Sequence, residues 1–433
     1  MSVKQHRILK GALTVPGDKS ISHRAVMFSA FTSGSSCIYG LSPADDCQST
    51  IACLKEAGLS IKRIEGEAPH YLIESRGINE LVAPKKTLNA GNSGTTMRLL
   101  AGLFAGRPFA SVFDGDDSLR RRPMGRVLDH LQEMGAKVEY LADPGKAPFR
   151  LSGGNLTGKD FQLTVASAQV ETALLLAGLQ ADGETSVRIP NQVRDHTTRM
   201  FAHLGIPYQQ EDGRVKVSKL QQPVAAKDIV VPGDISSAAF FIVAAACLPG
   251  SDIVLRNVGI NPGRTLVLDV LSRMGANILV NETPTRCGEP VANIRVRYNG
   301  RLGPATISGE EIAKGIDEIP ILSLAGALAN GEFIVEGASE LRHKESDRLK
   351  AIVENLKAAG ADVVEREDGF KMRGVESLKG GSQWLTHNDH RLAMSALVAQ
   401  LVCEKPLLIE EVHSPRISYP SFIEDLENLL EKE

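Results

Sequence analysis

The chain has 433 residues, of which 42% are hydrophobic and 23% are charged, a balance typical of a soluble globular protein. This length exceeds what one hydrophobic core usually serves, so we expect two or three domains. The net charge of −3 argues against overall attraction to nucleic acid or to an anionic membrane. The N-terminus has no apolar signal region, and no apolar stretch reaches membrane-spanning length without polar interruption. The six cysteines form no CxxC pair, so we predict a cytoplasmic protein with reduced thiols.

The first distinctive segment is VPGDKSISHR, which runs from Val15 to Arg24. In it, a turn-forming Pro-Gly-Asp leads into an apolar, Ala-containing run. The tetrapeptide VPGD returns at Val231 to Asp234, half a chain length further on, where the sequence reads VPGDISSAAFF. The second copy lacks the cations that follow the first, Lys19 and Arg24. We interpret this pattern as a duplicated scaffold with its chemistry concentrated in one copy, which is typical of an enzyme.

Two kinds of helix are predicted to recur along the chain. One is amphipathic and stops at a glycine, the residue that most easily adopts the left-handed conformation after a helix. Its copies end at Gly58, Gly135, Gly205, Gly275 and Gly360, with a sixth, lacking the glycine, at Phe422 to Leu430. The other is rich in Ala and apolar all round, which indicates burial. Its copies run to Gly34, Gly106, Gly183, Gly250 and Gly331, with a sixth ending near Glu404.

Short β-rich runs fill the gaps between these helices, for example KVEYL, VRIP, DIVLRNV and FIVEG. The chain is therefore expected to contain six similar units of roughly seventy residues, each with one buried and one half-exposed helix. Buried helices need sheets and partner helices to cover them, so an α/β architecture follows. Three units in each half agree with the VPGD duplication and predict two similar lobes.

Polar residues gather at the expected N-termini of the apolar helices, where unpaired N–H groups and the helix dipole favour anions. These starts read KSISHR, GNSGTTMR, SAQVET, DISS, IDEIP and NDHR. Ser, Asn and Asp are also the preferred N-caps, so capping alone is an alternative interpretation of each. Lys19, Arg24 and Arg98 favour more than capping, because a cation in an otherwise apolar helix is costly unless it is paired. An anionic ligand shared by several helix ends would account for all three.

Three further clusters are basic. In RRRPMGR, residues 120–126, we expect two or three of the arginines to be simply solvated. In RHKESDR, Lys344 and Arg348 are four residues apart and would share one face of a helix, with Glu345 to the side. A solvated salt-bridge network is the alternative for that segment. RDHTTR, residues 194–199, is explained nearly as well as a polar helix start.

Several well-known catalytic and ligand-binding motifs are incomplete or missing in this sequence. GGNLTGKD has Asp160 where a phosphate-binding loop needs Ser or Thr, so a turn is expected there. His387 and His390 lack a convincing third ligand, so we predict no metal site. The sequence has neither a dinucleotide-binding glycine fingerprint nor a nucleophile elbow. The expected chemistry is therefore the positioning of anions together with acid–base work by Lys and carboxylates.

Taken together, the segments VPGDKSISHR, NAGNSGTTMRLLAG, RRRPMGR, RHKESDRL and NDHRLAM resemble the 5-enolpyruvylshikimate-3-phosphate synthase family. The resemblance covers essentially the whole chain, and GNSGTT and DEIP are similar to its bacterial class II branch. It implies the enolpyruvyl transferase fold, an inside-out α/β barrel of two similar lobes, each with three βαβαββ units. The first lobe would be discontinuous, 1–16 with 234–433, and the second would span 17–233. The crossover turns would lie near 15–18 and 231–234.

The resemblance implies transfer of the enolpyruvyl group of phosphoenolpyruvate to the 5-hydroxyl of shikimate 3-phosphate, with release of phosphate. This reaction belongs to the shikimate pathway, which leads to chorismate and the aromatic amino acids. No metal or other cofactor is implied. We expect a monomer with small-molecule substrates and without nucleic-acid or membrane partners. Gly94 retains the small residue beside the phosphoenolpyruvate pocket, so we also expect glyphosate to inhibit by competing with phosphoenolpyruvate.

The same resemblance assigns residues. Contacts to shikimate 3-phosphate are implied for Lys19, Ser20, Arg24, Ser167, Ala168, Gln169, Arg194, Asp317 and Lys344. Contacts to phosphoenolpyruvate are implied for Lys19, Asn92, Gly94, Arg122, Gln169, Glu345, Arg348 and Arg391. Asp317 would be the general base in an addition followed by an elimination, and Glu345 or Lys19 would protonate the methylene carbon. Closure of the lobes on the first substrate would complete the site for the second.

The chain departs from the class I pattern at two positions. Ile417, beside Arg416, stands where that branch has a Lys contacting phosphoenolpyruvate, and Ala168 stands where it has a second Ser. The nearest rival is the UDP-N-acetylglucosamine enolpyruvyl transferase family, which has Lys-Asn where this chain has Lys19-Ser20 and a Cys in the loop that here reads RRRPMGR. A non-catalytic anion-binding protein of the same fold is a second rival, and it would leave Asp317 and Glu345 without a task.

Overall fold

The computed structural model describes residues 7–164, 167–190 and 194–431, so the opening residues 1–6 of the predicted first lobe lie outside the described residues. The chain divides into two compact units. The first unit comprises Met1–Pro16, Pro232–Pro284 and Pro290–Glu433, and the second comprises Gly17–Val231 and Thr285–Glu289. Among the described residues, no helix has the length and apolar character needed to cross a membrane.

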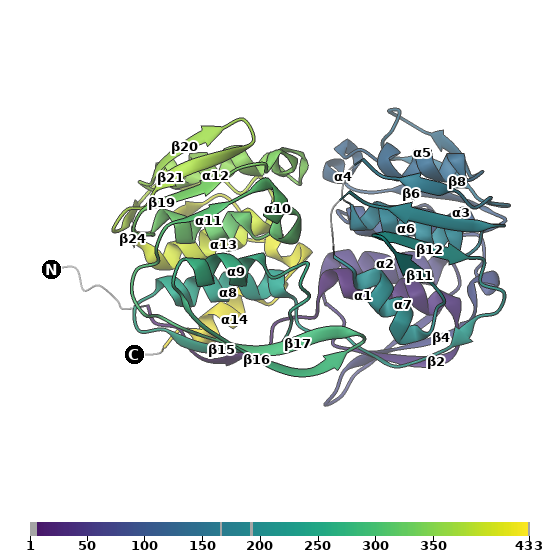
Figure 1. Ribbon diagram of the computed structural model, residues 1–433, viewed down its shortest axis with the longest axis horizontal. Helices are drawn as coiled ribbons and strands as arrows, with labels where there is room; N and C mark the ends of the chain where they lie inside the picture. The colour runs from purple at the N-terminus through teal and green to yellow at the C-terminus, as the bar shows by residue number, and fades with distance from the viewer. Residues whose placement is uncertain (1–6, 165–166, 191–193, 432–433) are drawn as a thin grey trace. The chain divides into compact units, whose positions relative to one another are not determined.

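The first unit contains the N-terminal strand and nearly all of the second half of the sequence (Figure 1). Its elements are β1 (Lys10–Leu13), α8 (Ile235–Cys247), β15 (Asp252–Gly259), α9 (Leu266–Arg273), β16 (Asn277–Arg286), β17 (Glu289–Arg297), β18 (Ala305–Ile307), α10 (Gly309–Gly315), α11 (Ile319–Ala327), β19 (Glu332–Val335), η3 (Ser339–His343), α12 (Arg348–Ala358), β20 (Asp362–Arg366), β21 (Gly369–Arg373), β22 (Leu378–Gly380), β23 (Gln383–Trp384), α13 (His390–Val402), β24 (Cys403–Lys405), β25 (Leu408–Ile409), η4 (Ser414–Ile417) and α14 (Phe422–Leu429).

The second unit contains the remaining elements of the first half. These are α1 (Lys19–Phe28), η1 (Ser29–Phe31), β2 (Thr32–Tyr39), α2 (Asp45–Glu56), β3 (Ser60–Ile64), β4 (His70–Arg76), η2 (Ile78–Glu80), β5 (Leu88–Asn89), α3 (Gly94–Ala105), β6 (Ala110–Asp114), α4 (Asp117–Arg121), α5 (Gly125–Glu133), β7 (Lys137–Tyr140), β8 (Phe149–Ser152), β9 (Asp160–Gln162), α6 (Ala168–Gly178), β10 (Glu184–Arg188), α7 (His196–Leu204), β11 (Gln209–Glu211), β12 (Arg214–Ser218), β13 (Val224–Ala225) and β14 (Ile229–Val230).

One sheet pattern repeats along the chain. A parallel strand pair is joined through a buried helix, and an antiparallel hairpin then extends the sheet, as in the order β5-β6-β8-β7. The orders β11-β12-β10-β9 and β18-β19-β21-β20 follow the same rule. The order β1-β15-β17-β16 has the same pairing, but the chain between β1 and β15 also runs through the second unit. The last unit differs from the expected six similar copies. It has only the parallel pairs β22-β24 and β23-β25 among the described residues, because the chain after α13 folds into η4 and α14 instead of a hairpin.

The two VPGD turns are the places where the chain passes from one unit to the other. Strand β1 precedes the first turn, yet it pairs with β15, which follows the second turn. Strand β14 precedes the second turn and pairs with β2, which follows the first. A side chain at Gly17 would place its Cβ 1.8 Å from the Gly40 carbonyl oxygen, so the close approach of backbone at this turn requires glycine.

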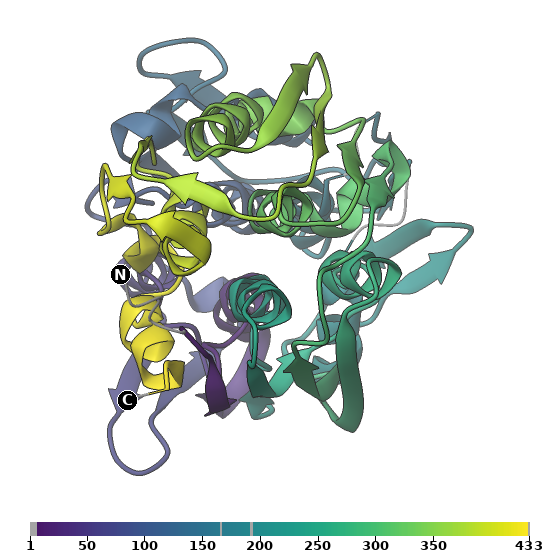
Figure 2. The ribbon, with the colours of Figure 1, turned by 90° about the vertical axis from the view of Figure 1, so that its left-hand side faces the viewer.

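The predicted apolar helices form the core of each unit. In the first unit α8, α11 and α13 pack against one another, and Figure 2 shows them end on. In the second unit α3 packs against both α1 and α6. The glycines expected after the amphipathic helices all have positive φ, from 82° at Gly205 to 117° at Gly135. One boundary is wrong. The first apolar helix ends at Phe28, and Gly34 lies inside β2, because the segment TSGSS that follows η1 is too polar to continue a buried helix.

Candidate active site

The first unit contains a cluster of carboxylates and cations around one buried guanidinium. Arg348 is 1% exposed at its side chain and begins α12. Its Nε donates to Asp389 Oδ2 at 2.7 Å, its Nη2 donates to Glu345 Oε2 at 2.7 Å, and its Nη1 donates to Asp317 Oδ1 at 3.2 Å. Three segments distant in the sequence are thereby joined at the N-terminal ends of α11, α12 and α13.

Asp317 is the carboxylate that most cations of this cluster approach. Besides Arg348, Lys344 Nζ lies 3.9 Å from Asp317 Oδ1, and Arg391 Nη2 lies 3.7 Å from Oδ2. Arg391 Nη1 also donates to the Asp317 backbone carbonyl at 3.1 Å. The cluster thus holds one carboxylate in a fixed orientation, which general-base work needs, beside cations that suit an anionic substrate.

The structure corrects the helical interpretation of RHKESDR. Lys344 and Glu345 are not on a helix with Arg348, because they lie between η3 and α12. Asp347 caps α12, since its side chain accepts a hydrogen bond from the Lys350 N–H at 3.1 Å. The helix therefore starts at Arg348, and the three residues meet through a turn instead of i,i+4 spacing.

Burial and charge act in opposite directions on the central pair. Burial by itself lowers the pKa of Arg348, but the carboxylates of Asp389, Glu345 and Asp317 more than offset it, and the pKa ends above its usual value. Burial likewise raises the pKa of Asp389, yet the Arg348 guanidinium holds it below its usual range. The Arg348–Asp389 pair therefore remains charged across the physiological pH range.

In the second unit, Arg24 is fixed by hydroxyl groups from two other helices. Its Nη2 donates to Thr172 Oγ1 at 2.8 Å on α6, and its Nε donates to Thr197 Oγ1 at 3.0 Å on α7. Its Nη1 donates to the Ser20 carbonyl at 3.0 Å. Burial lowers the pKa of Arg24 to about 10, against the opposing effect of the Asp18 carboxylate. Arg24 thus stays cationic near neutral pH, which the binding of an anion would require.

Lys19 and Ser20 form the first turn of α1, which Asp18 caps through a 2.9 Å hydrogen bond from the Ile21 N–H. Lys19 Nζ lies 2.9 Å from Asp46 Oδ2 on α2, in a pair whose lysine side chain is 20% exposed. Both Lys19 and Ser20 are half-buried. The arrangement offers a positioned ammonium at a helix start, which suits a phosphate or carboxylate.

Gln169 lies at the start of α6 and is held by two partners. Arg98 Nη1 donates to Gln169 Oε1 at 2.7 Å, and Gln169 Nε2 donates to Thr95 Oγ1 at 2.9 Å. Ser167 caps the same helix, since its side chain accepts from the Val170 N–H at 3.4 Å. Capping therefore does occur at this helix start, as the alternative interpretation held. It leaves the remaining lone pairs of a half-buried Ser167 available to a ligand.

The RRRPMGR loop behaves largely as expected. Arg120, Arg121 and Arg126 are exposed, and Arg120 pairs with Asp114 at 2.7 Å. Arg122 is half-buried and donates through Nη2 to Asn92 Oδ1 at 2.9 Å. The amide of Asn92 in turn donates to Asp116 at 2.7 Å. Three of these arginines are exposed, as the prediction of solvated residues requires, but Arg120 is held by Asp114 and is not simply solvated.

Gly94 begins α3 directly beside two guanidinium groups. A Cβ at this position would lie 3.0 Å from Arg98 Nη1 and 3.5 Å from Arg122 Nη1. An added Cβ would therefore press against Arg98 and touch Arg122, so the glycine keeps room beside both guanidinium groups.

For Ala168, Arg194 and Arg416 we describe only the position in the fold. Ala168 is the first residue of α6, and Arg194 is half-buried just before α7. Arg416 is exposed on η4.

Several groups that hold the candidate residues were not predicted, namely Asp46, Thr172, Thr197 and Asp389, and Glu318 was expected only as part of the polar helix start IDEIP. The signals for them were weak, because short polar residues at helix starts look like ordinary caps until the fold brings them together.

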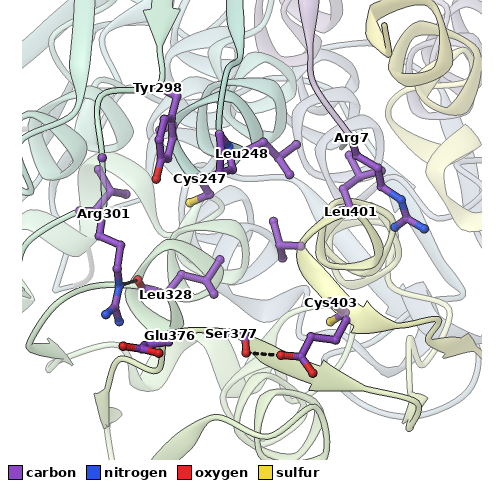
Figure 3. A pocket seen from close by; sticks show the side chains of 16 residues that line it. Arg7, Cys247, Leu248, Tyr298, Arg301, Leu328, Glu376, Ser377, Leu401 and Cys403 are labelled. Carbon is purple, nitrogen blue, oxygen red and sulfur yellow. Dashed lines mark hydrogen bonds between the residues drawn. The ribbon is translucent and has the colours of Figure 1, made fainter. Parts of the chain in front are cut away.

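A cavity of about 410 Å³ in the first unit lies elsewhere (Figure 3). Its wall includes Cys247 and Leu248 at the end of α8, Leu328 after α11 and Leu401 near the end of α13. It is thus at the C-terminal ends of the helices whose N-terminal ends carry Asp317 and Arg391. Backbone carbonyls at helix C-termini disfavour anions, so we do not assign this cavity to anionic substrates.

Glu171 gives a pH-dependent prediction. This residue of α6 is 5% exposed and lines a cavity of about 330 Å³, and burial raises the pKa of its carboxyl to about 7. The unfolded chain ionises it near the ordinary 4.5, so the stability of the folded state falls as pH rises from about 4.5 to about 7, and the penalty is complete above that range. We expect Glu171→Gln to stabilise the protein at pH 8, by on the order of 2–3 kcal/mol, and much less at pH 5. Urea unfolding at both pH values measures this.

The control for this experiment is Glu184→Gln, which changes an exposed glutamate in the same unit. It should leave the difference in stability between pH 5 and pH 8 as it is in the parent. Equal effects of Glu171→Gln at both pH values would contradict the assignment of a buried, titrating carboxyl.

Comparison with known proteins places these clusters in context. A model of the family "EPSP synthase (3-phosphoshikimate 1-carboxyvinyltransferase)" matches residues 3–426. A 3-phosphoshikimate 1-carboxyvinyltransferase of Bacillus licheniformis is 45% identical over 424 residues, covering 98% of each chain. One of Desulforudis audaxviator is 46% identical over 429 residues, covering 99% of each.

Solved structures agree with this match. An EPSP synthase of Acinetobacter baumannii has a TM-score of 0.87 and 38% identity, and the alignment covers 98% of this chain and 96% of that one. The enolpyruvyl transferase NikO of Streptomyces tendae has a TM-score of 0.80 at 18% identity, covering 99% of this chain and 96% of that one, a likeness that speaks for the fold alone. The α/β fold with two similar lobes predicted from the sequence is confirmed.

Proposed function

This chain belongs to the EPSP synthase family of 3-phosphoshikimate 1-carboxyvinyltransferases, and from that membership we propose how its residues divide the reaction. The chain is an enzyme that transfers the enolpyruvyl group of phosphoenolpyruvate to the 5-hydroxyl of shikimate 3-phosphate and releases phosphate. Asp317 carries the residue-level proposal, since it is the carboxylate that Arg348, Lys344 and Arg391 surround.

We assign the shikimate 3-phosphate site to the cluster around Arg24, with Lys344 and Asp317 of the first unit acting on the same substrate. Arg24 is held rigidly by threonine hydroxyls, and Lys19 and Ser20 offer their groups at a helix start. Ser167, Ala168 and Gln169 open α6 in the same way. Arg194, half-buried before α7, completes the set. A sugar-like ring with a phosphate matches this mixture of cations and hydrogen-bonding groups.

We assign the phosphoenolpyruvate site, from family membership, to arginines and small polar groups. Arg122 and Asn92 support each other through a 2.9 Å hydrogen bond, and Gly94 leaves space beside them. Arg348 and Arg391 supply further guanidinium groups, which can bind carboxylate or phosphate in a bidentate way. Lys19, Gln169 and Glu345 complete the assignment.

The proposed chemistry is an addition followed by an elimination. The 5-hydroxyl oxygen bonds to the central carbon of phosphoenolpyruvate, and its proton passes to Asp317. The methylene carbon gains a proton, for which Glu345 and Lys19 are the two candidates. The tetrahedral intermediate then loses a proton from that methyl group, the double bond re-forms, and phosphate leaves. Arginine and lysine side chains stabilise the charge on the departing phosphate.

Coupled phosphate release tests the function. The chain should release phosphate only when shikimate 3-phosphate and phosphoenolpyruvate are both present, and each omission should reduce the rate to background. Release from phosphoenolpyruvate alone, or none with both substrates, would contradict it. UDP-N-acetylglucosamine in place of shikimate 3-phosphate is the control that separates the related transferase activity.

We further propose that the enzyme is a cytoplasmic monomer. Support comes from the near-neutral composition, with a net charge of −3, and from the biosynthetic reaction. Light scattering should give the mass of one 46.5 kDa chain. Fractionation of the native cells should place the activity with the cytoplasm, and recovery with the membranes would contradict this location.

Glyphosate gives a prediction at Gly94. We expect glyphosate to inhibit competitively with phosphoenolpyruvate. Gly94→Ala should raise its inhibition constant about tenfold, because the new Cβ would press against Arg98 and fill the space beside Arg122. Inhibition constants measured at several phosphoenolpyruvate concentrations check this. Gly303→Ala is the control and should change nothing, because its Cβ would make only an ordinary 3.5 Å contact with the Met274 carbonyl oxygen. Absence of inhibition of the parent enzyme at millimolar glyphosate would contradict the prediction.

A further inference from the structure

A buried polar chain in the first unit runs from the second VPGD turn to the start of α11. Its members are Asp234, Arg264, Ser236 and Glu318, which are 7%, 3%, 2% and 0% exposed. Arg264 Nη2 donates to Asp234 Oδ1 at 3.1 Å and to Ser236 Oγ at 2.6 Å. Ser236 Oγ is in turn hydrogen-bonded to Glu318 Oε1. None of these residues has a role in the substrate sites assigned above.

The hydrogen-bonding capacity of the groups fixes the direction of this chain. A guanidinium can only donate, so the Ser236 oxygen accepts from Arg264. The single hydroxyl hydrogen of Ser236 is then left for Glu318, whose Oε1 accepts it. Glu318 Oε2 has no hydrogen-bond partner among the described residues, and no other hydrogen bond to this side chain is seen there. The hydroxyl of Ser236 therefore determines how the Glu318 carboxylate is oriented.

Glu318 lies beside the groups assigned to the reaction. Its Oε1 is 3.8 Å from Arg391 Nη1, the same nitrogen that donates to the Asp317 carbonyl at 3.1 Å. Glu318 also directly follows Asp317 in the chain. A carboxylate that is fully buried without a complete set of hydrogen bonds is costly, which favours a task in holding Arg391 over a role in stability alone.

The duplication in the sequence gives Ser236 a counterpart. In the two VPGD segments, Ser236 corresponds to Ser20, which stands two residues after the first VPGD. Ser20 is assigned to shikimate 3-phosphate, whereas the Ser236 hydroxyl bonds to Glu318 inside its own unit. The serine two residues after VPGD is thus assigned to substrate in one copy and bonds to a buried carboxylate beside Arg391 in the other.

We propose that Ser236 and Arg264 are positioning residues for the phosphoenolpyruvate half of the reaction. They orient Glu318, and Glu318 holds Arg391 beside Asp317. This inference rests on the proposed function, in which Arg391 binds phosphoenolpyruvate and Asp317 is the base. The proposal gives the second VPGD segment, which lacks the cations of the first, a function through Ser236.

The test is a kinetic comparison of Ser236→Ala with the parent enzyme. We expect KM for phosphoenolpyruvate to rise about tenfold, because the buried carboxylate loses its hydrogen bond. KM for shikimate 3-phosphate should stay within about twofold, since Arg24 and its partners are untouched. Arg264→Lys, which keeps the charge but loses the forked donor geometry, should change the kinetics in the same direction.

The matched control is Ser395→Ala. Ser395 is also 2% exposed, it lies on α13, and its Oγ has no hydrogen-bond partner among the described residues. It should leave both KM values unchanged. The double variant Ser236→Ala/Glu318→Gln should have the same KM for phosphoenolpyruvate as Glu318→Gln alone, because Ser236 acts on Arg391 only through Glu318.

Outcomes separate this inference from the function itself. An inactive parent enzyme would overturn the proposed function. An active parent with unchanged KM for phosphoenolpyruvate in Ser236→Ala and Arg264→Lys would overturn the positioning role alone. Equal rises of both KM values would also overturn it, since a purely structural loss would affect the two substrates alike.

Discussion

Asp317→Ala should lower kcat about 10³-fold while shikimate 3-phosphate still binds with an affinity within about tenfold of the parent. The reason is that the variant lacks the carboxylate that we propose takes the proton of the 5-hydroxyl, whereas Arg24 and its threonine partners remain in place. Stopped-flow or steady-state phosphate release gives kcat, and calorimetric titration with shikimate 3-phosphate gives the affinity.

Two further variants test whether the loss of activity comes from the Asp317 carboxylate itself. Asp317→Asn keeps the shape and should be almost as slow, because an amide cannot accept the proton as a base. Asp269→Asn changes an exposed carboxylate on α9 of the same unit and should leave the rate unchanged. Near-parental turnover of either Asp317 variant would contradict its role as the base.

Arg348→Met is expected to produce the largest loss of stability, about 3–5 kcal/mol, together with loss of activity. The guanidinium is 1% exposed and contacts the carboxylates of Asp317, Glu345 and Asp389. Its removal leaves like charges close together without the cation that compensates them. Methionine fills much of the volume of the arginine side chain. The loss of stability should therefore come mainly from the missing charge and hydrogen bonds and less from a cavity. Urea-induced unfolding measures it.

A surface arginine provides the control for Arg348. Arg366 pairs with Glu336 at 2.7 Å but is 40% exposed, so Arg366→Met should cost less than about 1 kcal/mol. Adding Asp389→Asn to Arg348→Met should restore part of the lost stability, because one uncompensated charge is removed. Equal effects of the Arg348 and Arg366 variants would contradict the buried network.

The sequence was most informative where a local rule decides the structure. Glycines after amphipathic helices took the left-handed conformation, as at Gly205 and Gly360, because few other residues adopt it without strain. The cost of burying an unpaired charge predicted partners for Arg24, and the structure gives it hydrogen bonds to Thr172 and Thr197.

Features that depend on tertiary contacts were harder to predict. The sequence suggested a helix through Lys344, Glu345 and Arg348, because Lys344 and Arg348 are four residues apart. The structure has a turn between η3 and α12 there instead. Asp389 and Glu318 looked like ordinary polar helix starts, and only the fold shows their contacts with arginines. The last unit has no antiparallel hairpin among its described residues, and the repeated helix pattern in the sequence does not indicate this difference.

The central claim is that an addition–elimination reaction takes place on this chain, and deuterium incorporation tests it most directly. In D₂O, a group in exchange with solvent would deliver deuterium to the methylene carbon, and the methyl group of the intermediate would then lose one of its three hydrogens. We predict deuterium in the vinyl methylene of the product, measured by NMR after turnover of shikimate 3-phosphate and phosphoenolpyruvate. A fully converted product without deuterium at that carbon would contradict the account.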